Sequence, residues 1–208
     1  MVSSAAGYSA ISSESRVQIL HMLQTRPQRT IDELVESTGL HANTVREHLQ
    51  RLTEDGYVVS ETERRETRGR PRTLYSAATG TPEASSPIAE RKVREAAKRG
   101  DLMRRVMPET DDSDLDHDEL HQIDALVENL IDSGFDPLVN PNDLTIDLSP
   151  CAHMGTPGQE PSMRCAVHVT LLQSVVTQAG GPLNVEGLRT TCNPQDCVIQ
   201  LRRANPEA

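Results

Sequence analysis

The chain has 208 residues, with 21 Lys and Arg against 31 Asp and Glu, and a formal net charge of -10. This length allows one large or two small domains. No apolar run approaches the roughly 20 residues that a membrane span needs, so no membrane association is expected. The N-terminus, MVSSAAGYSA, lacks the basic and apolar blocks of a signal peptide, and we expect a cytoplasmic protein.

The negative charge is distributed unevenly along the chain. Residues 1–80 contain ten Lys or Arg and ten Asp or Glu, whereas residues 111–208 contain four and sixteen. The acidic balance therefore belongs to the C-terminal half, which should be repelled by phosphate groups and should lie away from nucleic acid. Residues 1–80 have no net charge, so this repulsion does not apply to them.

Residues 30–58 contain two short helices joined by a tight turn. Thr30 and Glu33 form a capping box, because the threonine hydroxyl can accept from the backbone N–H three residues on while the glutamate reaches back. The helix that starts there ends at Gly39, a residue suited to a left-handed turn. A further helix is expected ahead of this pair, with an apolar stripe that packs on it.

The second helix of the pair presents polar side chains beside a buried stripe. Val45, Leu49 and Leu52 recur at helical spacing and should face the core. A helix that follows a tight turn and exposes polar residues near its N-terminus has the geometry that enters the DNA major groove. The residues expected to meet base edges or phosphates are Asn43, Thr44, Arg46 and Gln50.

Two short strands, residues 56–59 and 73–75, flank an arginine-rich loop and are typical of a winged hairpin. Gly69 and Pro71 hold this loop extended, so that its arginines can lie along a narrow minor groove or over phosphates. The string RGRPR also resembles the core of an AT-hook, and a solvated hairpin loop is the alternative. The arginines are Arg64, Arg65, Arg68, Arg70 and Arg72.

Residues 81–110 combine the end of a linker with a basic helix. The segment TGTPEASS is a linker by composition, and residues 87–107 predict a helix in which apolar residues are thinly spread among basic ones. Such a helix has too little apolar surface to bury within one chain, so it packs on a partner, as a dimerisation element, or on the winged domain. A solvated connector is the alternative. Its apolar positions are Ile88, Val93, Ala97 and Met103.

The C-terminal part, residues 111–208, predicts the order helix, strand, strand, helix, strand, strand. The acidic run from Glu109 to Leu120 lacks the central glycine of a calcium loop and is expected to cap the first helix. These elements are expected at residues 121–133, 135–139, 144–148, 161–179, 183–188 and 197–201. The fold class is therefore α+β, with a winged helix domain over residues 1–80 and a four-stranded sheet with helices on one face.

All four cysteines lie in this acidic part, at Cys151, Cys165, Cys192 and Cys197. Thiols stay reduced in the cytoplasm, so ligation or core packing is favoured over disulfides. If the sheet forms as predicted, the cysteines can converge at one end of it, and thiolates are the ligands that iron–sulfur clusters and soft metals select. His168 lies one helical turn after Cys165 and is a reserve ligand. A place in the core is the alternative for Cys165 and for Cys197.

The segment from Arg16 to Tyr75, with TVREHLQRLTEDGYV and RGRPRTLY, resembles the winged helix of the ArsR/DeoR-type regulators. The whole chain is similar to the iron–sulfur-responsive SufR-type repressors of the cluster-assembly operon. In that family one cysteine follows a strand, a second is followed by a histidine one helical turn later, and another lies near the last strand. The matching positions here are Cys151, Cys165, His168 and Cys197.

The sequence thus predicts a DNA-binding transcriptional regulator, a repressor that binds a double-stranded DNA operator as a homodimer. The resemblance implies that an iron–sulfur cluster in the C-terminal domain controls it and that it regulates cluster-assembly genes. Cys192, His168 or an exogenous group would complete the site. The alternative is a structural or sensory zinc ion there, with a small-molecule effector. A thiol enzyme built on Cys165 and His168 would need an orienting group and an oxyanion feature that are not visible, so no enzymatic activity is expected.

Overall fold

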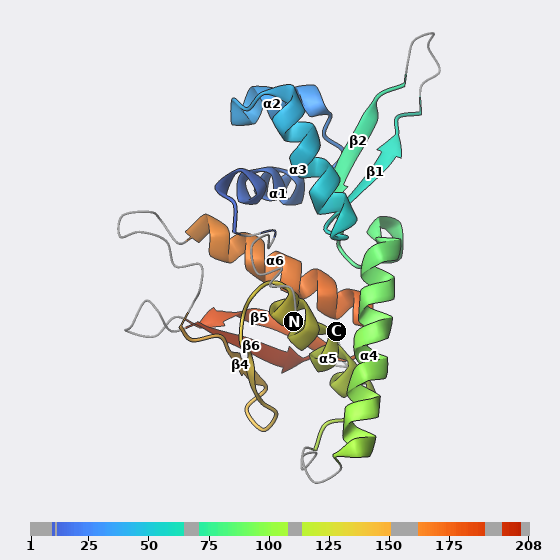
Figure 1. Ribbon diagram of the computed structural model, residues 1–208, viewed down its shortest axis with the longest axis vertical. Coiled ribbons are helices and arrows are strands. Elements are labelled where there is room, and N and C mark those ends of the chain that lie inside the picture. The colour runs from blue at the N-terminus through green and yellow to red at the C-terminus, as the bar shows by residue number, and fades with distance from the viewer. Residues whose placement is uncertain are drawn as a thin grey trace, which may run out of the picture.

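The structure is a computed structural model that describes residues 10, 12–64, 71–107, 114–150, 162–189 and 197–204. Its elements form two parts that follow each other along the long axis of the molecule (Figure 1). The first part contains α1 (Glu14–Thr25), α2 (Ile31–Thr38), α3 (Ala42–Glu54), β1 (Val58–Thr62) and β2 (Thr73–Ala77). A short 3-10 helix, η1 (Pro82–Ala84), and α4 (Pro87–Val106) lead to the second part. That part contains α5 (His117–Asp132), β3 (Leu138–Asn140), β4 (Thr145–Asp147), α6 (Ser162–Ala179), β5 (Leu183–Arg189) and β6 (Val198–Arg203).

The capping box predicted for α2 is present. The Thr30 hydroxyl accepts from the Glu33 backbone N–H at 3.3 Å, and the Glu33 carboxylate accepts from the Thr30 backbone N–H at 2.7 Å. The Thr30 backbone N–H, and next the Thr30 hydroxyl, which also donates to Glu33 Oε2 at 2.9 Å, hold the pKa of Glu33 below its usual range. Gly39 ends the helix at φ 68°, in the left-handed region that the tight turn requires. Local sequence chemistry therefore determines both ends of α2.

The hairpin of β1 and β2 is antiparallel, with register from Val58 opposite Ala77 to Thr62 opposite Thr73. Its base is attached to the helices by two backbone hydrogen bonds between Arg29 and Tyr75, of 2.9 and 2.8 Å. The predicted winged hairpin is confirmed, and it projects beyond α3 at the end of the molecule remote from the second part (Figure 1).

Helix α4 packs within the chain, against α5 and α6. The expectation was that this helix packs on a partner or on the winged domain, or is a solvated connector, and its packing on α5 and α6 differs from that expectation. Ala96 is the buried position, and Met103 is 52% exposed. A Cβ on Gly100 would lie 2.0 Å from the Asp124 carboxylate, so the small residues of α4 allow α5 to come close. Ion pairs then supply much of the contact: Lys92–Asp132, Arg99–Glu128 and Arg104–Asp124.

The second sheet has the strand order β3-β4-β6-β5, with every neighbouring pair antiparallel. Side chains alternate along β6, because Ile199 and Leu201 are buried while Gln200 between them is partly exposed. The buried face joins a core with residues of α5 and α6, and α6 contacts β5. This arrangement agrees with the predicted α+β fold.

Gln122 of α5 is the most deeply buried polar side chain in the described part of the chain, at 1% exposure. Its Nε2 donates to the carbonyl of Val176 at 3.1 Å and to that of Leu183 at 3.0 Å, and its Oε1 accepts from the Leu183 backbone N–H at 2.8 Å. The Val176 carbonyl belongs to the last turn of α6, where helical carbonyls lack a partner within the helix. Gln122, on α5, therefore caps the C-terminal end of α6 and also holds the start of β5.

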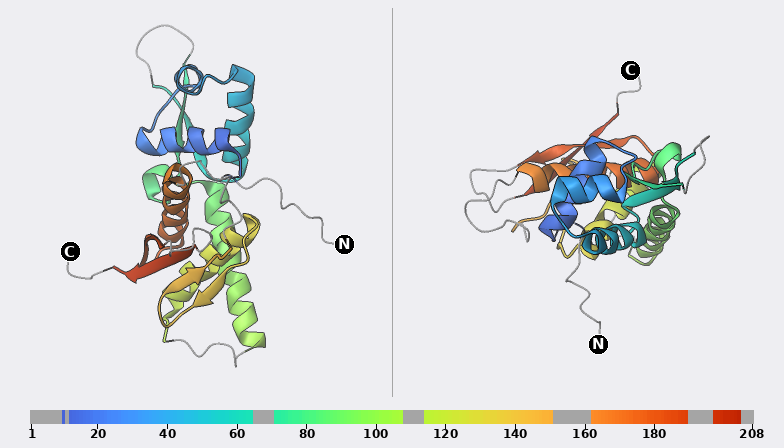
Figure 2. Two further views of the ribbon diagram at one scale, coloured as in Figure 1. Left: turned by 90° about the vertical axis from the view of Figure 1, so that its left-hand side faces the viewer. Right: turned by 90° about the horizontal axis from the view of Figure 1, so that it is seen from above.

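Helix α6 lies between the winged helix and the sheet, in contact with α1 on one side and β5 on the other (Figures 1 and 2). The buried apolar residues of both parts belong to one continuous hydrophobic cluster. In the part of the chain that the structure describes, no helix is long and apolar enough to cross a membrane.

Candidate functional site

Helix α3 separates a buried face from a polar one. Its start is capped by His41, whose Nδ1 accepts from the Asn43 backbone N–H at 3.2 Å. Val45, Leu49 and Leu52 are at most 1% exposed and fix the rotation of the helix against the core. On the other faces Asn43, Arg46 and Gln50 are exposed and Thr44 is half-buried.

The polar side chains of α3 bond one another along the helix. Arg46 Nη1 donates to Asn43 Oδ1 at 2.9 Å, and Gln50 Nε2 donates to Glu54 Oε1 at 2.8 Å. An arginine presents five N–H donors, so the bond to Asn43 leaves others that can reach a base or a phosphate. The exposed strip of α3 thus offers a cation and amides, side-chain types that are used in major-groove readout.

The described part of the wing holds two of its five arginines. Arg64 and Arg72 are exposed at the outer end of the hairpin, where the Glu63 backbone N–H donates to the Arg72 carbonyl at 2.8 Å. Arg65, Arg68 and Arg70 lie outside the described residues. The two arginines that are described therefore flank the end of a hairpin that stands beside α3 (Figure 1).

Comparison with protein families agrees with this geometry. The family described as "Bacterial regulatory protein, arsR family" matches residues 13–60, which cover α1, α2, α3 and the start of β1. Residues 13–60 form an ArsR-family helix-turn-helix domain. The chain that carries this domain is a DNA-binding transcriptional regulator, a class of protein that is usually not enzymatic.

One solved structure is also similar, that of a "predicted DNA-binding transcriptional regulator from E. coli". The identity is 32%, over 40% of this chain and 79% of the solved chain. The TM-score of 0.29 is too low to argue a shared architecture from the superposition. None of the curated proteins compared with the chain matches it.

His48 makes the stability of the ArsR-family domain sensitive to pH. Its Nδ1 is buried without a hydrogen-bond partner in the described part of the chain. Burial, and next the positive charge of Arg16 on α1, hold the pKa of His48 below its ordinary value of 6.5, with opposed smaller effects of Glu47 and Arg51. The unfolded chain therefore takes up this proton at a higher pH than the folded chain does.

We expect the free energy of unfolding to fall as the pH decreases below about 6.5, because protons then favour the unfolded chain. Glu33 and Asp101 have pKa values below their ordinary values of 4.5 and 3.8, so they contribute only at lower pH. Urea denaturation at pH 7.5 and at pH 5.5 measures the effect. The loss of stability should be smaller in His48→Gln, and an equal loss would contradict the assignment.

The structure describes three of the five predicted ligands of the thiol site. Cys165 is half-buried on α6, Cys197 is buried just before β6, and both are thiols. His168 is 7% exposed, and its ring stacks on Phe135 with a centroid distance of 5.3 Å. Cys151 and Cys192 lie outside the described residues. Within the described ranges, Cys165, His168 and Cys197 do not bring their ligand atoms together into a three-ligand group.

Helix α6, which carries Cys165, is also the helix on which the ArsR-family domain rests. Gln24 of α1 donates from Nε2 to the Val167 carbonyl at 3.4 Å. Further along α6, a Cβ on Gly80 would lie 2.3 Å from the Ser174 carbonyl, and Gly80 has φ 79°. The chain that leaves the wing therefore touches α6 so closely that no side chain fits between them.

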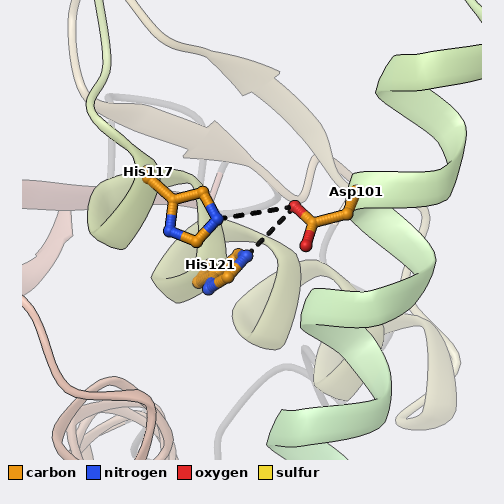
Figure 3. Close-up of side chains that lie close together, drawn as sticks. All are labelled: Asp101, His117 and His121. Carbon is orange, nitrogen blue, oxygen red and sulfur yellow. Dashed lines mark hydrogen bonds and ion pairs between the residues drawn. The ribbon is translucent and has the colours of Figure 1, made fainter.

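A cluster that the sequence interpretation missed joins α4 to α5. His121 Nε2 lies 3.1 Å from Asp101 Oδ1, and His117 Nε2 lies 4.0 Å from the same oxygen (Figure 3). Hydrogen bonds from Arg104 first, and then from His121, hold the pKa of Asp101 below its usual range. The available signal was the spacing of His117 and His121, four residues apart and so on one face of a helix.

A pocket opens where the two parts of the molecule meet. It is lined by the turn after α3 and by α4, α5 and α6, and includes Tyr57, Val93, Ala125 and Val175. Asp55 also lines the pocket, and burial raises its pKa above the ordinary value, while the charge of Lys92 opposes this. Apolar walls with a few polar groups are typical of sites for small molecules.

Proposed function

We propose that this regulator is a homodimeric repressor whose acidic C-terminal part, residues 111–208, binds an iron–sulfur cluster, and that cluster occupancy changes its affinity for DNA. Residues 1–80 read the operator, and residues 81–110 connect the two parts and contribute to the dimer. The observation that carries the proposal is the double role of α6, which bears Cys165 and also contacts α1.

On the DNA side, α3 would lie in the major groove and the wing along the neighbouring backbone or minor groove. Arg46 is suited to a guanine or a phosphate, and Asn43, Thr44 and Gln50 are suited to base edges or to nearby phosphates. The wing arginines, Arg64, Arg65, Arg68, Arg70 and Arg72, would neutralise phosphates. Arg64 and Arg72, the two that the structure describes, are exposed, which supports this role.

On the sensor side, hydrogen bonds near the ends of two strands support a shared thiol site. The Cys197 backbone N–H donates to Ser149 Oγ at 3.1 Å, and the Leu148 backbone N–H donates to the Cys197 carbonyl at 2.8 Å. Cys151 follows Ser149 by two residues, and two residues of extended chain span about 7 Å. Chain connectivity alone thus keeps Cys151 within reach of Cys197.

The proposed ligands are Cys151, Cys165 and Cys197, completed by Cys192 or His168. The stacking of His168 on Phe135 favours a packing role for this histidine. A cluster near the start of α6 would act on α1 through the packed surface between the two helices. A coupling of about 1–3 kcal/mol between cluster and DNA corresponds to a change in affinity of about 5- to 150-fold.

The dimer rests on separate observations. Proteins of the helix-turn-helix type commonly bind two half-sites about one helical turn apart, which requires two copies of the reading helix. The end of α4 also exposes large apolar side chains, as an interface would. They are Leu102, Met103, Val106 and Met107, at 59, 52, 68 and 45% exposure.

Anaerobic purification of the full chain tests the proposal. We expect a brown protein with broad visible absorbance, bound iron and acid-labile sulfide, and an affinity for operator DNA that changes at least about fivefold when the cluster is removed. Cys165→Ser should lose the iron, whereas Ala166→Ser, on the exposed side of the same turn, should keep it. Iron content, sulfide content and DNA binding are the measurements.

The contrary outcomes are distinct. If the protein is colourless and binds one zinc ion, and Cys165→Ser does not bind it, the thiol site holds zinc rather than a cluster. A colourless protein without metal would remove the thiol site from the mechanism. The second candidate function, control by a small-molecule effector, is favoured by the pocket between the two parts, because a ligand there would touch the turn after α3 and α6 together.

A further inference from the structure

We propose that Asp101, His117 and His121 form a binding site for a divalent transition metal ion such as Zn²⁺, separate from the thiols. The site lies between α4 and α5, at the end of α4 away from the winged helix (Figures 1 and 3). Two imidazole nitrogens and one carboxylate oxygen are the donor set that zinc and its neighbours accept in open sites with a bound water.

The three ligand atoms already converge. Both Nε2 atoms face Asp101 Oδ1, at 4.0 Å for His117 and 3.1 Å for His121, and all three atoms lie within 4.8 Å of one another. Ligand atoms about 2.0–2.2 Å from a tetrahedral zinc ion are about 3.3–3.6 Å apart. Only His117 must move inward, and this ring is 70% exposed, so packing does not oppose the movement.

The helices determine this convergence. His117 and His121 stand one turn apart on α5 with ring centroids 3.9 Å apart. Asp101 comes from α4, which approaches closely because its neighbour Gly100 leaves room for the α5 carboxylate of Asp124. An ion bound here would therefore join two helices rather than two residues of one turn.

Of the charged groups around the cluster, Asp118 favours a cation at this position, whereas Arg104 competes with it for Asp101. Asp118 Oδ1 lies 3.7 Å from His117 Nδ1, so a carboxylate faces the ring nitrogen opposite the proposed ion, as is common for histidine ligands. Arg104 Nη2 also donates to Asp101 Oδ1, at 2.9 Å, the oxygen that faces both imidazoles, so a metal ion must displace this bond or bind Asp101 through Oδ2. The Arg104 guanidinium donates two further bonds to Asp124, of 3.0 and 2.8 Å. The Asp124 carboxylate would therefore still balance the charge of Arg104 when Asp101 binds a metal ion.

The test uses the full, untagged chain after treatment with a chelator. Titration with Zn²⁺ by calorimetry should show a site whose affinity falls more than about 100-fold in His117→Gln and in Asp101→Asn. The exposed ring of His117 packs on little, so this variant should fold, as circular dichroism will show. His21→Gln on α1 is the matched control and should titrate as the wild type does.

Substitution with Co²⁺ separates this site from the thiols. Cobalt on nitrogen and oxygen ligands gives weak visible bands, whereas cobalt on thiolates adds intense charge-transfer absorbance. Cys165→Ser should keep the weak bands, and His117→Gln should lose them. Identical Zn²⁺ titrations of wild type and His117→Gln, or cobalt spectra with thiolate bands alone, would overturn the proposal and leave the proposed iron–sulfur function untouched.

Discussion

Replacing Arg46 with alanine is expected to weaken binding to operator DNA by about 10- to 100-fold, because a bidentate contact to one base is worth about 1–3 kcal/mol. Arg46 is exposed on α3, and its guanidinium is held toward the helix N-terminus by Asn43. The probe is the duplex that the wild-type protein selects from a random-sequence library, and binding is measured by fluorescence anisotropy.

Two further variants determine what Arg46 contacts. Arg202→Ala removes the same charge from an exposed position on β6 and should change the affinity little. Arg46→Lys keeps the charge but not the planar fork of donors. If Arg46→Lys binds as weakly as Arg46→Ala, the contact is to a base. If Arg46→Ala weakens binding to all sequences equally and reduces the salt dependence, it is to a phosphate. Equal affinities of Arg46→Ala and Arg202→Ala would exclude Arg46 from the interface.

Replacing Gln122 with alanine should lower the free energy of unfolding by about 3–5 kcal/mol, since three buried backbone groups lose their partner and a cavity forms. The groups are the carbonyls of Val176 and Leu183 and the N–H of Leu183. For a chain of this size, the melting temperature should fall by roughly 10 °C. Urea denaturation and thermal scanning of the apo-protein measure the change.

Gln122→Met separates the two causes of this loss. Methionine fills most of the volume but satisfies none of the three groups, so most of the loss should remain. Gln50→Ala is the control for the amide itself, because this exposed side chain has one bond, to Glu54, and should change stability little. Full recovery of stability in Gln122→Met would mean that packing, rather than hydrogen bonding, makes Gln122 important.

The parts of the fold that could be predicted from the sequence are those with local chemistry. Thr30 with Glu33 begins a helix, Gly39 ends it, and the strands of the wing are bounded by their own turn residues. The stripe Val45, Leu49 and Leu52 gave the rotation of α3 correctly, because one apolar face must be buried. The candidate DNA-reading residues on α3 followed from that rotation.

The parts that could not be predicted depend on contacts distant in the chain. The rotation of α4 is determined by Ala96, Gly100 and ion pairs to α5, none of which has a helical hydrophobic pattern. Gln122 looks like a solvent-exposed position, although it caps a helix that begins 40 residues later. Asp101 could be joined to His117 and His121 only once α4 and α5 were known to be neighbours.

The hydrophobic cluster that runs from α1 through α6 to the sheet, among the residues that the structure describes, has a consequence for how the protein is degraded in the cell. When two domains are joined by a flexible linker, one can unfold and be degraded without the other. A DNA-binding fragment can then remain after the second domain has been degraded. Here the two parts share their buried surface, so they should melt as one cooperative unit. If the C-terminal part fails to fold, the whole chain should then be exposed to proteases, and no separate DNA-binding fragment is expected to persist.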